Sequence, residues 1–82
     1  MDKKTIEAFV LGLVSDLSHM GKEEINRDST FDGLHMDSLD INELVVFIES
    51  EYDIEITEET MVEVNTVGKL LDCVYTLVGV QS

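Results

Sequence analysis

Gly33-Leu34-His35-Met36-Asp37-Ser38-Leu39-Asp40 leads from a polar segment into a run whose apolar residues recur at helical spacing. The segment therefore marks the start of a helix. Ser38 lies at this start, between Asp37 and Asp40. A serine at such a place either caps the helix or is a site where another group is attached. Capping is sufficient to explain the serine, but it does not explain the two flanking carboxylates.

Residues 38–51 are expected to form a helix with two different faces. At about 100° per residue, one face gathers the apolar residues that belong in the core, namely Ile41, Leu44, Val45, Ile48 and Tyr52. On the opposite face, Leu39 and Val46 lie together beside Asp40 and Glu43. An apolar ridge rimmed with carboxylates is typical of a docking surface. We therefore assign to a partner-binding surface Asp37, Leu39, Asp40, Glu43 and Val46.

A helix is also expected near the N-terminus, with Thr5 as its cap and Gly21 as its stop. Its apolar stripe consists of Ile6, Phe9, Val10, Leu13, Val14 and Leu17. Residues 18–36 then form a long polar connection without a helical or strand pattern. A connection of this length needs its own side chains to hold it down, and Ile25 and Phe31 are suited to that task.

Two more helices are expected in the last third of the chain. Thr57 caps a short helix over residues 58–63, whose first turn is acidic. Thr66 caps the last helix, whose apolar stripe consists of Val67, Leu70, Leu71, Val74, Leu77 and Val78. The sequence therefore predicts one all-α domain over residues 1–82. It is a four-helix bundle of three long helices and one short helix, with a long loop between the first two.

The composition restricts the classes of partner. The chain has 82 residues, of which 44% are hydrophobic, and a formal net charge of −13. Nucleic acids and anionic membrane surfaces are disfavoured because both require Lys and Arg, and we expect no membrane insertion. Proteins with basic docking patches are favoured. Cys73 is the only cysteine and cannot form an internal disulfide, so the fold needs no oxidising compartment. We expect the protein to be cytoplasmic, and we expect a monomer.

Two other kinds of site can be set aside on spacing. Asp28 and Asp32 match positions 1 and 5 of an EF-hand loop, but Leu39 stands at position 12, where a bidentate Glu is needed. We therefore expect no metal site, only weak and diffuse cation binding. Ser38 and His35, with a neighbouring Asp, supply the residue types of a hydrolytic triad. They lie within one turn of each other with no enclosed pocket, so we expect no catalytic residues.

The chain resembles an acyl carrier protein over nearly its whole length. The tetrapeptide around Ser38 would be weak evidence alone, but here it opens an acidic amphipathic helix in an acidic, all-helical domain. The agreement is carried by Asp37-Ser38-Leu39-Asp40, Glu43-Leu44-Val45, Ile25, Phe31, Tyr52-Asp53-Ile54-Glu55-Ile56, Met61, Val64 and Thr66-Val67.

The resemblance implies a carrier without catalytic activity of its own. It implies that Ser38 receives 4'-phosphopantetheine from coenzyme A through a phosphopantetheinyl transferase. The terminal thiol of this arm would hold acyl groups as thioesters and present them to acyl-transferring and synthase enzymes, in fatty-acid or related biosynthesis. A phosphodiester at Ser38 would lie beside the positive end of a helix dipole, which is physically favourable.

The resemblance also implies an acyl cavity between the second and third helices. Its expected walls are Val45, Ile48, Met61 and Val64. The family usually has small residues where this chain has Met61 and Phe47. We therefore expect these two side chains to narrow or redirect the cavity.

Several positions depart from the family pattern. His35 stands where a glycine is usual, and the loop over residues 31–38 is one residue shorter than is common. Asn42, Phe47 and Ser50 replace an apolar residue, a small residue and a glutamate. These differences favour a specialised carrier. Two alternatives therefore stay open: a carrier of polyketide or aminoacyl intermediates, and an unmodified acidic adaptor or cation-binding protein.

Overall fold

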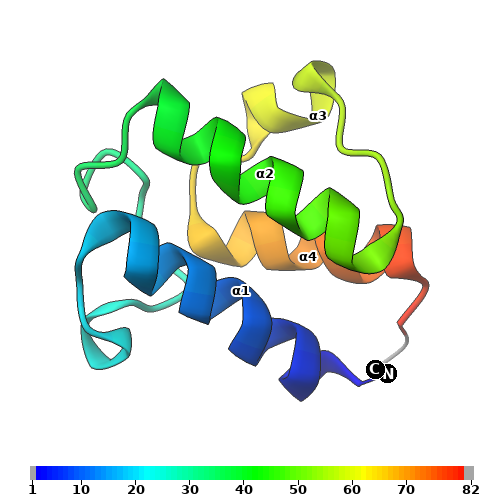
Figure 1. Cartoon of the computed structure of the whole chain (residues 1–82), viewed down its shortest axis with the longest axis horizontal. Coiled ribbons are helices and arrows are strands. Elements are labelled where there is room, and N and C mark those ends of the chain that lie inside the picture. Colours follow the sequence, from blue (N-terminus) through cyan, green and yellow to red (C-terminus); the bar gives the residue numbers. More distant parts are fainter. Residues whose placement is uncertain (1, 81–82) are drawn as a thin grey trace.

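The computed structural model describes residues 2–80 and contains a helical bundle (Figure 1). Its elements are α1 (Lys3–Ser18), a 3₁₀ turn η1 (Lys22–Glu24), α2 (Ser38–Tyr52), α3 (Glu58–Glu63) and α4 (Val67–Val78). α1 packs against both α2 and α4, and α3 lies on the side of α2 that faces away from α1. The all-α bundle of three long helices and one short helix is confirmed, as is the long loop before α2.

The ends of α1 differ from the prediction. The helix begins three residues before the expected place because Asp2, and not Thr5, is its cap. The Oδ1 atom of Asp2 accepts a 2.9 Å hydrogen bond from the backbone N–H of Thr5, and a carboxylate at this end also suits the helix dipole. α1 ends at Ser18 and is followed by the C-cap His19, whose φ of 61° is left-handed, so the expected stop at Gly21 was wrong.

The core lies between α1, α2 and α4. Nine of its side chains are less than 2% exposed, namely Ile6, Val10, Val14, Leu44, Ile48, Val67, Leu70, Leu71 and Val74. In α4 the predicted stripe was wrong at one position, because Leu77 is 44% exposed while Tyr75 is buried. These two residues lie at opposite edges of the stripe. α1 covers the edge that holds Tyr75, where Lys3 Nζ lies 5.0 Å from the centre of the ring.

The long connection between α1 and α2 is packed against the core, as its apolar side chains predicted. Ile25 and Phe31 are 6% and 5% exposed, and Leu34 and Met36 are buried beside them. The backbone of the connection is also tied to the segment around the start of α4. Phe31 N–H donates to the carbonyl of Asn65 over 3.4 Å. These contacts fix the chain immediately before Ser38.

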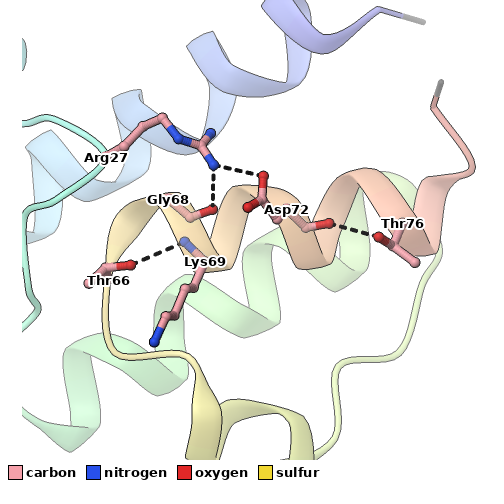
Figure 2. A network of polar contacts seen from close by, with 6 residues as sticks. All are labelled: Arg27, Thr66, Gly68, Lys69, Asp72 and Thr76. Carbon is pink, nitrogen blue, oxygen red and sulfur yellow. Dashed lines mark hydrogen bonds and ion pairs between the residues drawn. The ribbon is translucent and has the colours of Figure 1, made fainter. Parts of the chain in front are cut away.

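The first turn of α4 is held by the same connection (Figure 2). Val67 N–H donates to the carbonyl of Ser29 over 3.0 Å, and Gly68 N–H donates to that of Arg27 over 2.9 Å. Lys69 N–H donates to the cap Thr66, so the otherwise unpaired amides of this helix end have partners. A Cβ on Gly68 would lie 2.9 Å from the carbonyl oxygen of Arg27, so only glycine permits this approach.

Arg27 adds side-chain bonds to this junction. Its Nη2 atom lies 2.7 Å from Oδ1 of Asp72 and donates to the carbonyl of Gly68 over 3.3 Å (Figure 2). The two charged side chains are 52% and 65% exposed, so the ion pair is largely solvated. Arg27 therefore joins the α1–α2 connection to the second turn of α4 without a buried charge.

Candidate functional site

The start of α2 is capped by Asp37. Its Oδ1 atom accepts a 2.9 Å hydrogen bond from the backbone N–H of Asp40, and Oδ2 of Asp40 accepts a 3.4 Å bond from the N–H of Asp37. These reciprocal bonds form a capping box. Of the two alternatives for Ser38, the helix cap is therefore excluded, because Asp37 caps the helix.

Ser38 is the first residue of α2, and it is exposed. Within residues 2–80 its hydroxyl makes no hydrogen bond, and the backbone N–H groups of Ser38 and Leu39 have no partner. An exposed hydroxyl beside two free amides at the positive end of a helix is suited to a phosphate ester.

A tight turn positions this helix end. Leu34 and Met36 are buried, and their backbone N–H groups donate to the carbonyl of Phe31 over 3.2 and 3.0 Å. Between them, His35 is exposed and has a left-handed backbone with φ of 59°. Glycine adopts this conformation without strain, whereas a residue with a Cβ does not. The structure therefore shows His35 as a strained turn residue.

The outer face of α2 presents apolar side chains to solvent. Leu39, Val46 and Phe47 are 76%, 52% and 50% exposed, and Glu43 lies among them. The helix contains neither Lys nor Arg. The five residues assigned to a partner-binding surface are thus brought together at the start and on the outside of α2, and Phe47 extends their apolar part.

A groove of about 350 Å³ runs between α2 and α3 and begins at Ser38. It is lined by Ser38, Ile41, Asn42, Val45, Glu49, Ile56, Glu58 and Met61. Of the expected cavity walls, Val45 and Met61 border this groove. Ile48 is fully buried in the core, and Val64 lines a separate groove between α3 and α4. Phe47 does not border the groove, so it does not narrow it here.

Five lining residues were missed, and α2 carried a signal for three of them. These three, Ile41, Asn42 and Glu49, follow Ser38 by three, four and eleven residues, a spacing that places all of them on the same face of a helix as Ser38. The positions of Ile56 and Glu58 depend on how the loop after α2 folds. That loop is fixed by a 2.7 Å hydrogen bond from the N–H of Ile56 to Oε2 of Glu49, which no periodicity indicates.

The other reactive side chains among the described residues form no further site. Burial raises the pKa of the Cys73 thiol, which disfavours the reactive thiolate. Within residues 2–80, no three His, Cys, Asp or Glu side chains are grouped so that they could hold a metal ion. None of the helices described is both long enough and apolar enough to span a bilayer.

Comparison with known proteins identifies the family. A family model described as "Phosphopantetheine attachment site" matches residues 8–74. The acyl carrier protein of Buchnera aphidicola subsp. Schizaphis graminum (strain Sg) is 40% identical over 68 residues, which cover 82% of this chain and 86% of that protein. The acyl carrier protein of Buchnera aphidicola subsp. Acyrthosiphon pisum (strain Tuc7) is 39% identical over 70 residues, or 84% and 88% of the two chains. The chain therefore belongs to the acyl carrier protein family, whose members carry acyl intermediates on covalently bound 4'-phosphopantetheine and are not catalysts themselves.

Proposed function

We propose that Ser38 is the residue that carries 4'-phosphopantetheine in this chain. The observation that supports this assignment is the exposed and unbonded hydroxyl at the first residue of α2, in a helix that Asp37 already caps. Modification of Ser38 would leave the capping box intact. The N–H groups of Ser38 and Leu39 would lie close to the phosphate, where they can donate to its oxygens.

The arm supplies the thiol that forms the thioester with an acyl group. Cys73 is unsuited to that task because it is partly buried and its thiol pKa is raised. The chain itself orients the arm at the end of α2 and offers the groove beside Ser38 to its cargo. We propose that Val45 and Met61 contact the acyl group there, and that Ile48 and Val64 become accessible if α2 and α3 move apart.

We also propose that partner enzymes bind the outer face of α2. Members of this family interact with transferases and synthases. A phosphopantetheinyl transferase and the acyl-transferring enzymes of fatty-acid or related biosynthesis would bring basic patches to a surface that consists of Asp37, Leu39, Asp40, Glu43 and Val46. Charge complementarity would speed their encounter, and the apolar ridge would hold the docked complex. We place this exchange in the cytoplasm, with the chain as a monomer.

The test is the intact mass of the chain after incubation with coenzyme A and a broad-specificity phosphopantetheinyl transferase. We expect the mass to increase by one phosphopantetheine in the natural sequence and not in Ser38→Ala. Ser50→Ala is the matched control, because Ser50 is another exposed serine of α2 and is expected to leave loading unchanged. Full loading of the Ser38→Ala variant would contradict the assignment.

A further inference from the structure

The groove beside Ser38 changes in character along its length. Ser38 and Asn42 lie in the first two turns of α2, whereas Glu49 lies in its last turns. Glu58 is the first residue of α3, which begins on the side of the C-terminal half of α2 (Figure 1). The remaining lining residues are apolar, namely Ile41, Val45, Ile56 and Met61, and on α2 only Val45 lies between Asn42 and Glu49.

Glu49 is held in position at this groove. Its Oε2 atom accepts the 2.7 Å hydrogen bond from the N–H of Ile56, and its backbone carbonyl accepts a 3.3 Å bond from the N–H of Ile54. Ile56 is only 6% exposed, so a Glu49 side chain that swung into solvent would leave an amide of a buried residue without its partner. The bond therefore keeps the charged carboxylate of Glu49 at the groove, where it is unfavourable for an apolar acyl group.

The apolar part of the groove is short. Along α2 it extends from Asn42 to Glu49, a span of about 10 Å at the helical rise of 1.5 Å per residue. An acyl group within this span removes apolar surface from water, which stabilises the loaded protein. An alkyl chain that continues to Glu49 covers a carboxylate and removes water from it, which is unfavourable. Methylenes that extend as far as Glu49 are therefore not expected to stabilise the loaded protein further.

We propose that Glu49 is a specificity-determining residue that limits the sheltered cargo to short acyl groups. The inference rests on the proposed attachment of cargo through Ser38. It assigns to Glu49 two connected effects: its carboxylate holds the loop that leads to α3, and it ends the apolar surface that an acyl chain can cover. Longer chains on this carrier stay partly in solvent or with the partner enzyme.

The experiment compares acyl chain lengths on the loaded protein. Butanoyl, octanoyl and dodecanoyl phosphopantetheine are transferred to the natural sequence and to three variants, and the Tm of each is compared with that of the unacylated form. Glu49→Gln removes the charge but keeps a side-chain oxygen that can accept from Ile56 N–H. Glu49→Leu extends the apolar surface. Glu51→Gln is the matched control, because Glu51 is exposed on the same helix and does not border the groove.

We expect the natural sequence and Glu51→Gln to gain no more Tm from dodecanoyl than from octanoyl. In both Glu49 variants the Tm is expected to rise further with dodecanoyl. A steady rise through dodecanoyl in the natural sequence would overturn the inference, as would an unchanged profile in both Glu49 variants. Intact mass reports loading separately. A chain that no transferase loads would overturn the proposed function, and the inference with it.

Discussion

The backbone N–H of Asp40 donates a 2.9 Å hydrogen bond to Oδ1 of Asp37, one residue before the serine that opens α2. Because of this bond, the capping of α2 does not depend on the side chain of its first residue, Ser38. Asp37 caps the helix through the N–H of Asp40, and the hydroxyl of Ser38 remains free. A group can therefore be added at Ser38 without any change to the capping bond.

The first prediction compares the two residues. Asp37→Ala removes the cap and is expected to lower the free energy of unfolding of the apo protein by about 1 kcal/mol. Ser38→Ala is expected to change it by less than about 0.5 kcal/mol, because an exposed side chain without a bond is removed. Chemical denaturation measures both values. Asp37→Asn keeps an acceptor oxygen and serves as the control. Equal losses for Asp37→Ala and Ser38→Ala would contradict the assignment of the cap.

The second prediction concerns His35, whose φ of 59° places a Cβ-bearing residue in the left-handed region. His35→Gly relieves a strain of about 1–2 kcal/mol but increases the entropy of the unfolded chain by up to about 1 kcal/mol. We expect a net stabilisation of up to about 1 kcal/mol by thermal or chemical denaturation. His35→Ala keeps the Cβ and is expected to give no gain. If the glycine and alanine variants were equally stable, backbone strain would not be the cause.

Much of the bundle could be predicted from local signals. Thr57 and Thr66 were expected as caps, and their side-chain oxygens accept the backbone N–H groups of Thr60 and Lys69. Periodicity placed Leu44 in the core correctly. These features depend on a few neighbouring residues. The ends of α1 were not predicted, because Asp2 and Thr5 are both good caps and only the folded backbone decides between them.

The site was less predictable than the helix that carries it. The motif around Ser38 locates the start of α2, and helical spacing locates its exposed ridge. The groove depends on how α3 is placed, and the loop before α3 is held by the bond between Glu49 in α2 and Ile56, seven residues later. Val64 was expected in the same cavity as Val45, but it follows the last residue of α3 and borders α4 instead. Tertiary contacts of this kind leave no periodic pattern in a sequence.

The third prediction concerns the ion pair of Arg27 and Asp72. Because both side chains are more than half exposed, a double-mutant cycle with alanine is expected to give a coupling energy of about 0.2–1 kcal/mol. Arg27→Ala is expected to be the more destabilising single change, because Arg27 also donates to the carbonyl of Gly68. Salt is expected to reduce the coupling. A coupling energy that did not change between low and high salt would contradict the prediction, because it would mean that the ion pair is shielded from solvent.

The fourth prediction is a loss of stability at alkaline pH. Burial raises the pKa of the Tyr52 and Tyr75 hydroxyls and that of the Cys73 thiol above their ordinary values. Between the unfolded and folded pKa values, the unfolded chain has released protons that the folded chain still holds. A rise in pH therefore favours unfolding.

We expect the free energy of unfolding to be insensitive to these groups below about pH 8, and to fall as the pH passes the ordinary pKa of each group. Urea titrations at several pH values measure the slope. Cys73→Ala is expected to remove the first part of the decrease, near pH 9, and Tyr52→Phe a later part. An unchanged slope in both variants would mean that general charge repulsion causes the loss.

The last prediction tests the outer face of α2 with two charge reversals of equal size. Glu43→Lys and Glu23→Lys each change the net charge by +2, from −13 to −11. Glu43 lies among the exposed apolar side chains of α2, whereas Glu23 is exposed in the 3₁₀ turn η1.

If basic enzymes dock on α2, Glu43→Lys slows the loading of Ser38 by a phosphopantetheinyl transferase several-fold at low salt. Glu23→Lys has a smaller effect, because it alters only the long-range attraction. The difference between the two rates is expected to shrink as salt screens the charges. Equal rates for both variants at low salt would show that net charge, and not this surface, guides the enzyme.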